Sequence, residues 1–249
     1  MSKHVLENCG SRNCDDVTSR RSLLRQAMLA TVCGVTGWAG YSTTKAIGSP
    51  QSQAPEVPTT PEEALQKLLE GNRRFADGKS LASNRDIDRV REVANEQKPF
   101  AAFLGCADSR VPIEIVFDQG FGDLFVTRIA GNVASSENIG SLEFGTQILG
   151  AKVLYVLGHT ECGAVSATMK GTDVPGQISG LFQHIRPAVK AAKGDLNKAI
   201  LENVRNQAIL LAEASPVISK MVQRKELIVV GGIYDLATGA VTPVDVGVN

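Results

Sequence analysis

The chain has 249 residues, 43% of them hydrophobic, and its 26 basic side chains balance its 26 acidic ones. This is the composition of an ordinary globular protein, and without a basic excess we expect no binding to nucleic acid. No run reaches the roughly 18 strongly apolar residues that cross a bilayer, so we expect no stable membrane span in the mature chain.

The first 46 residues have the pattern of an export signal. Arg20 and Arg21 stand ahead of a weakly apolar stretch at residues 26–41, which predicts a twin-arginine signal peptide. We therefore predict a signal peptide at residues 1–46 and a linker rich in Pro, Ser and Gln at residues 47–60. Such a signal directs a chain to the periplasm or to the lumen of an internal membrane compartment. The alternative is a disordered tail or an uncleaved anchor.

The five cysteines are scattered and odd in number, which does not suggest a disulfide framework. Three of them lie in the predicted signal peptide, so the mature chain keeps Cys106 and Cys162. In an oxidising compartment two such cysteines either form one disulfide or are occupied thiols. Their surroundings in the sequence favour occupied thiols.

Helices and strands alternate beyond residue 60. A proline and two acids open a helix at Pro61, and continuous apolar runs such as residues 153–157 predict strands buried on both faces. The predicted helices cover residues 61–75, 86–96, 137–149, 164–169, 178–192 and 196–213. The predicted strands cover residues 100–105, 124–129, 153–157 and 227–230, followed by a hairpin-like piece at residues 232–244.

This alternation predicts an α/β fold for residues 61–249, with a mainly parallel central β-sheet flanked by helices and an N-terminal helical arm. Functional sites of parallel sheets lie at the carboxyl ends of the strands. Cys106 directly follows the first predicted strand, and His159 follows the third.

His159 and Cys162 are three residues apart where a strand gives way to a helix, so both can face one point. Cys106, from a neighbouring strand end, completes three ligands of a kind that suits zinc with a fourth position open. No further Cys or His has the spacing of a closed structural site, since His4 lies in the predicted signal peptide. His184 sits among polar neighbours in a predicted helix, where a surface or core-edge histidine is the simpler interpretation.

Asp108 and Arg110 are two residues apart in the loop after Cys106. An arginine can bind a carboxylate through two parallel hydrogen bonds, which fixes its orientation and keeps it ionised. Such a carboxylate can accept the proton of a metal-bound hydroxide, or it can swing onto the metal as a fourth ligand. The alternative is a surface ion pair, which contributes little to stability.

The segments CADSR, at residues 106–110, and HTECG, at residues 159–163, together resemble the signatures of the β-class carbonic anhydrases. The resemblance extends from about residue 61 to residue 244, and the stretch at residues 106–133 is especially close to bacterial members. It implies a zinc enzyme for the reversible hydration of carbon dioxide to bicarbonate and a proton, by attack of zinc-bound hydroxide.

The resemblance also implies roles for single residues. It makes Cys106, His159 and Cys162 the zinc ligands, and Asp108 and Arg110 the catalytic dyad beside them. It places Gln97, Phe125, Phe144 and Gly163 in the substrate pocket.

Gln97 matches the glutamine that donates to bicarbonate in the plant-like subtype. Phe103 stands where the other subtype carries a tryptophan of a regulatory bicarbonate site, which argues against that site. Phe144 replaces the tyrosine that is usual in plant-like members, so the wall of the pocket keeps a ring and lacks the hydroxyl.

The resemblance further implies a homodimer or homotetramer, in which Gln97 and Phe125 reach the site of the partner subunit and the helix at Pro61 wraps around the partner. Other functions stay open. The same fold could hydrolyse CS₂ or COS, the chain could be a non-enzymatic zinc- or bicarbonate-binding paralogue, or Cys106 and Cys162 could form the disulfide of a redox protein. Intact Asp108, Arg110 and Gln97 argue against a paralogue that has lost its activity.

Overall fold

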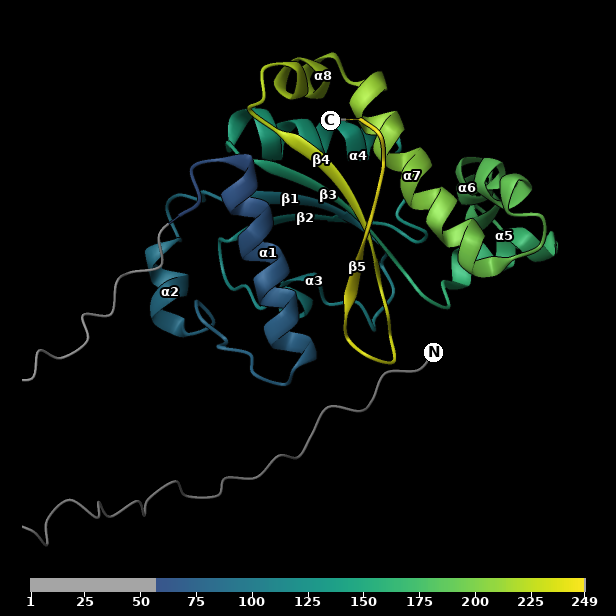
Figure 1. Cartoon of the computed structure of the whole chain (residues 1–249). Coiled ribbons are helices and arrows are strands. Elements are labelled where there is room, and N and C mark those ends of the chain that lie inside the picture. Colours follow the sequence, from purple (N-terminus) through teal and green to yellow (C-terminus); the bar gives the residue numbers. More distant parts are fainter. Residues whose placement is uncertain (1–56, 249) are drawn as a thin grey trace, which may run out of the picture. The chain divides into compact units, whose positions relative to one another are not determined.

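The computed structural model describes residues 57–248 (Figure 1), so the predicted signal peptide and most of the linker lie outside the described residues. Five strands form one sheet in the order β2-β1-β3-β4-β5. The first four are parallel and the fifth pairs antiparallel with β4. The strands are β1 (Ala101–Gly105), β2 (Leu124–Arg128), β3 (Val153–His159), β4 (Ile228–Tyr234) and β5 (Val241–Val244).

Helices cover both faces of this sheet, as Figure 1 shows. None of the described helices has both the length and the apolar character needed to cross a membrane. The helices are α1 (Pro61–Ala76), α2 (Ile87–Glu92), α3 (Ile113–Val116), α4 (Ser136–Glu143), a π-helical turn η1 (Phe144–Ile148), α5 (Gly163–Lys170), α6 (Ile178–Ala192), α7 (Leu196–Ala214) and α8 (Pro216–Gln223).

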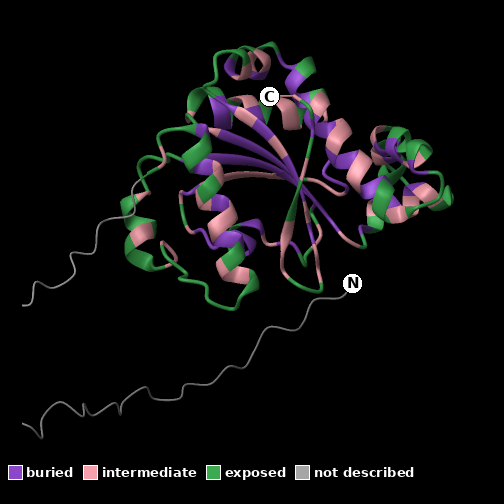
Figure 2. Ribbon diagram, viewed as in Figure 1, coloured by how far each residue is buried: buried purple, intermediate pink, exposed green. Residues whose placement is uncertain are grey.

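The central strands β1 and β3 are buried along their whole length (Figure 2). Successive side chains of a strand point to opposite faces. In β1, Ala102 and Leu104 accordingly pack with residues of α7 and α8, whereas Ala101 and Phe103 pack with residues of α1 and α3. This two-sided burial explains why the strands read as continuous apolar runs in the sequence, and it confirms the predicted α/β fold.

Helix α1 begins where the sequence signals it. Thr60 accepts a hydrogen bond from the Glu63 N–H, and the Glu63 carboxylate accepts one from the Thr60 N–H, which together form a capping box. Ala64 and Leu68 are fully buried against the chain's own sheet. The chain's own sheet therefore covers Ala64 and Leu68, and the expectation that this helix wraps around a partner stays a prediction.

The helices differ from the predictions in four places. The helix predicted at residues 86–96 ends at Glu92, and the one predicted at residues 137–149 changes from α4 into the π-helical turn η1. Helix α8 was not predicted, although Ser215 caps it and Pro216 opens it, which is a recognised start signal. The short α3 was not predicted either, because its four residues are too few to show the spacing of apolar side chains that marks a helix.

Candidate metal centre

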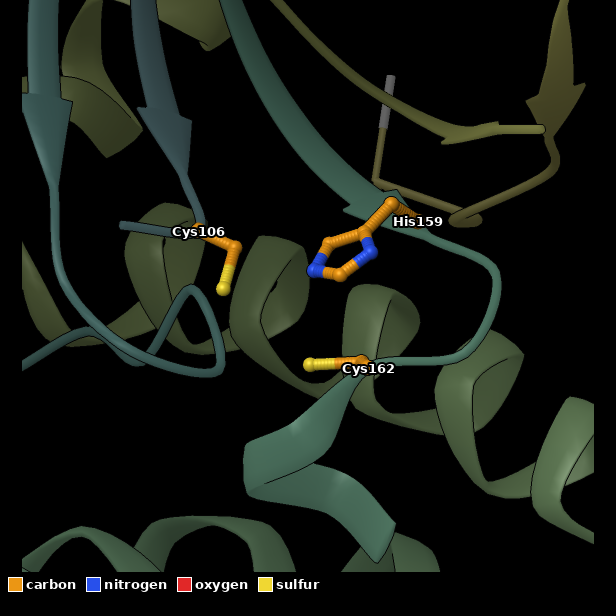
Figure 3. A group of neighbouring side chains, drawn as sticks. All are labelled: Cys106, His159 and Cys162. Atoms are coloured by element: carbon orange, nitrogen blue, oxygen red, sulfur yellow. The ribbon is translucent and has the colours of Figure 1, made fainter. Parts of the chain in front are cut away.

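The carboxyl ends of β1 and β3 bring the three predicted metal ligands together (Figure 3). Gly105 lies opposite Leu157 in the parallel pairing, so Cys106 and His159 both lie at the carboxyl ends of these two neighbouring strands. The chain then turns through the left-handed residue Glu161, and Cys162 caps the amino end of α5. The two Sγ atoms and a ring nitrogen of His159 lie within 4.8 Å of one another, and all three residues are buried.

The His159 ring is oriented for a ligand role. Its Nδ1 lies 2.8 Å from the carbonyl oxygen of Thr160. A carbonyl can only accept, so Nδ1 carries the proton and Nε2 presents a lone pair. Nε2 is buried and finds no hydrogen-bond partner among the described residues. A buried nitrogen of this kind is costly unless something binds to it.

The two thiols interact with each other. A hydrogen bond from Cys162, together with one from the Gly131 N–H at 3.3 Å, lowers the pKa of Cys106 to about 4 despite its burial. The pKa of Cys162 is raised, because its proton is held against the Cys106 thiolate and because the thiol is buried. Both cysteines are free. Since metal ligands are thiolates, cation binding would release the proton that the pair retains.

These observations fit a metal ion. Two sulfurs and one unpaired imidazole nitrogen converge on a shared point, and this donor set suits a thiophilic divalent cation. His184 does not join the group. It lies half-buried on α6, with Nε2 3.3 Å from the side-chain nitrogen of Gln183, as the sequence interpretation expected.

Asp108 and Arg110 form a bidentate pair beside the three ligands. The Nε and Nη2 atoms of Arg110 donate to the two carboxylate oxygens at 2.9 and 2.7 Å, and the Arg110 N–H adds a bond of 2.9 Å. These bonds hold the pKa of Asp108 well below its usual range. Oδ2 of Asp108 is 3.8 Å from Nε2 of His159, so the pair belongs to the site.

The four predicted pocket residues divide into two groups. Gly163 directly follows Cys162 and is therefore at the site. Gln97 precedes β1, whose five residues at about 3.3 Å each put the amino end of the strand roughly 15 Å from Cys106, and its neighbours Glu96 and Lys98 line a pocket with Phe100 at that end. Phe125 lies opposite Ala102, at the far end of the strand from the ligands.

The Phe144 ring lies with the Phe125 ring, at 6.3 Å between centroids, and Phe144 is 47% exposed. One protomer therefore does not bring Gln97, Phe125 or Phe144 to its own metal centre.

Two residues that contact the site were not predicted. Arg128 donates to the backbone carbonyls of Cys106 and Asp108, and the Gly131 N–H donates to the Cys106 sulfur. Both residues lie within the stretch at residues 106–133 that resembles the family. Their contacts involve backbone groups, however, and no pattern of side chains encodes these.

Comparison with known proteins agrees with this geometry. The model of the carbonic anhydrase family matches residues 101–241. Carbonic anhydrase 2 of Mycobacterium tuberculosis is 36% identical over 189 residues, which cover 73% of this chain and 91% of that protein. The carbonic anhydrase of Mycolicibacterium smegmatis is 35% identical over 191 residues, covering 74% and 93%.

Among solved structures, the Coccomyxa β-carbonic anhydrase in complex with acetazolamide superposes with a TM-score of 0.56 at 31% identity, covering 72% of this chain and 85% of that one. This chain belongs to the β-class carbonic anhydrase family. The family and the enzyme class predicted from the sequence are thereby confirmed. The twin-arginine signal and the plant-like subtype of β-class carbonic anhydrase stay predictions.

Proposed function

We propose that this β-class carbonic anhydrase is a zinc enzyme that reversibly hydrates carbon dioxide to bicarbonate and a proton. The observation that carries the proposal is the buried group of Cys106, His159 and Cys162 with an arginine-bound carboxylate beside it. Family membership supports the reaction, because hydration of carbon dioxide is the general activity of carbonic anhydrases.

Zinc is the proposed metal because two thiolates and one imidazole form a common catalytic ligand set for it, with the fourth position left open. When bound, zinc supplies a hydroxide near neutral pH by lowering the pKa of a water molecule. The chain's own contribution is the arrangement of three buried ligand atoms within 4.8 Å of one another.

Asp108 acts in this proposal as the acceptor that orients the nucleophile. Its lowered pKa keeps the carboxylate ionised, so it can accept a hydrogen bond and cannot donate one. The site therefore favours an oxygen that carries a proton, which a hydroxide does. Arg110 fixes the direction of the carboxylate through its two parallel bonds. In this role Asp108 is not a fourth zinc ligand during turnover.

The substrate pocket is proposed to form between two subunits of a homodimer or homotetramer. The amide of Gln97 would donate to bicarbonate, and Phe125 and Phe144 would supply an apolar wall for carbon dioxide. Gln97 is exposed and distant from its own Cys106, which supports donation to a partner subunit. Strand β2, which carries Phe125, lies at the edge of the sheet, where a second subunit can approach.

We also propose export by the twin-arginine route to the periplasm or an internal membrane lumen. The support is the pair Arg20 and Arg21 ahead of the weakly apolar stretch at residues 26–41. This route carries folded proteins, so the metal would be loaded before export. Changing both arginines to lysine in the producing cells should retain the chain in the cytoplasm, and unchanged export would contradict this proposal.

The hydration reaction can be tested on the purified mature chain by stopped-flow measurement with a pH indicator, together with metal analysis. We expect His159→Ala to lose both zinc and hydration activity. The matched control is His184→Ala, which changes a half-buried histidine outside the site and should keep both. Undiminished hydration by a metal-free His159→Ala protein would refute the proposed function.

A further inference from the structure

Arg128 is the last residue of β2 and lies opposite Gly105, the last residue of β1. Its side chain reaches across to the turn that follows β1. Nε donates to the carbonyl oxygen of Cys106 at 2.9 Å, and Nη2 donates to the carbonyl oxygen of Asp108 at 2.6 Å. One guanidinium thus binds the backbone on both sides of Ala107.

The geometry of this contact is restrictive. The guanidinium is planar, and its Nε–H and one Nη–H point to the same side in a fixed fork. Two carbonyls that accept from this fork must keep a set spacing and direction. A backbone bond of 3.2 Å from the Ala107 N–H to the Ile129 carbonyl joins the same two segments. The turn at residues 106–108, called the ligand turn below, is therefore tied to the end of β2 at three points.

The ligand turn carries two functional side chains. Cys106 provides a sulfur of the metal group, and Asp108 provides the carboxylate 3.8 Å from the third ligand, His159. Arg110 binds only the carboxylate end of Asp108, whereas Arg128 binds its backbone. The two arginines therefore hold Asp108 from opposite ends, and only Arg128 also holds the backbone of Cys106.

We propose that Arg128 is a positioning residue of the metal centre, which sets the position of the Cys106 sulfur relative to the Asp108 carboxylate by binding the two backbone carbonyls of the ligand turn. This inference rests on the proposed function, in which Cys106 binds the metal and Asp108 orients the nucleophile. It adds a residue that acts through the backbone and contacts neither metal nor substrate in this role.

The test compares two substitutions of Arg128 in the full mature chain. Arg128→Lys keeps the charge but cannot span both carbonyls with a planar fork, and Arg128→Met removes the charge as well. The matched control is Arg205→Lys on α7, because Arg205 also donates its Nε–H to a backbone carbonyl, that of Asp245 at 3.0 Å. Zinc affinity is measured by competition with a chelator, and kcat and KM by stopped flow.

We expect Arg128→Lys to weaken zinc binding or lower kcat by about 10-fold and Arg128→Met by about 100-fold, which is the usual range for residues that support metal ligands. KM should change less than kcat. The visible absorption of the Co²⁺-substituted protein reports ligand geometry, so it should shift in both variants and not in Arg205→Lys.

A purely structural role predicts something else. Both Arg128 variants would then have lower thermal stability in the metal-free form, with wild-type zinc affinity, kcat and Co²⁺ spectrum once folded, and that result would overturn the inference. Failure of both variants to fold would also overturn it, because it would assign Arg128 to the fold as a whole. If wild-type protein neither binds zinc nor hydrates carbon dioxide, the proposed function itself fails.

Discussion

Nε2 of His159 and Oδ2 of Asp108 lie 3.8 Å apart, the first an unpaired nitrogen and the second an oxygen held by Arg110. The separation is too long for a hydrogen bond. A lone pair and a fixed anionic acceptor therefore face the same small space, which the two cysteine sulfurs also border. His159 and the two cysteines would therefore hold a metal, whereas Asp108 would orient the group that binds beside it.

This division of roles predicts that substitution of a metal ligand and substitution of the proton acceptor have different effects. Asp108→Ala should keep zinc and lose turnover by about 100-fold or more, as expected when a positioned proton acceptor is removed. Asp88→Ala is a matched control. Asp88 forms an exposed ion pair with Arg91, with 2.8 Å between Oδ1 and Nη1, and neither residue belongs to the metal group. Metal analysis and stopped-flow rates are measured on the same samples. Loss of zinc from Asp108→Ala would mean that Asp108 is mainly a ligand.

The distance between Gln97 and its own Cys106 predicts complementation between subunits. Gln97→Ala and Cys106→Ser should each lose most activity, since one lacks the amide donor and the other the metal. A mixed dimer of the two has one intact site, so it should recover about half of wild-type activity by symmetry. Co-expression with two different tags isolates the mixed dimer. If that dimer is no more active than its parents, Gln97 does not serve the partner's site.

A substitution at Gly145 should alter the proposed substrate pocket and leave the metal centre unchanged. A Cβ at this residue would lie 2.6 Å from Cδ1 of Phe125, so Gly145→Ala must displace the Phe125 ring. We expect kcat/KM to fall several-fold, with zinc content unchanged. Gly140→Ala is the control, because a Cβ there meets nothing within 4 Å. An unchanged kcat/KM in Gly145→Ala, measured by stopped flow, would argue against a role for Phe125 in the pocket.

We expect Asp118 to make a pH-dependent contribution to the free energy of unfolding. Its side chain is fully buried and accepts from Arg74 at 2.8 Å and from the N–H groups of Leu81 and Ala82 at 2.9 and 3.0 Å. Burial raises its pKa, but these bonds outweigh burial and leave the pKa below its usual value. Asp118→Asn should therefore lower the free energy of unfolding at pH 7 by about 2 kcal/mol.

The sign of the pH effect follows from that lowered pKa. Stability from Asp118 is present above the pKa of the unfolded carboxyl, near 3.9, and is lost as the pH falls through the lower folded value. Urea unfolding of the metal-free wild type and of Asp118→Asn should give different free energies of unfolding at neutral pH, and this difference should become smaller below about pH 4. A difference of the same size at both pH values would contradict this account.

The sequence predicted those parts of the fold that follow local rules. The amphipathic helix α6 matches its predicted bounds, and the buried strands were visible as apolar runs. The end of α2 was predicted wrongly because residues beyond Glu92 are compatible with a helix. Val93, however, packs against Gly122, a tertiary contact without a local pattern.

The same division applies to the site. The ligands and the dyad lie in two short segments at strand ends, so their spacing and the strand pattern together predicted that they meet. Arg128 was missed because it acts on backbone carbonyls, which every residue has. The position of Gln97 relative to a site depends on a second subunit, which no spacing within one chain can encode.

Activity depends, in the proposed function, on one metal ion held by Cys106, His159 and Cys162. Stepwise return of Zn²⁺ to the metal-free mature chain, with hydration of carbon dioxide measured after each addition, tests it directly. We predict that the rate rises linearly from near zero and levels off at about one zinc per chain, since the described residues hold one such group. Full hydration activity in the chelated protein, or a rate that does not follow added zinc, would contradict the account.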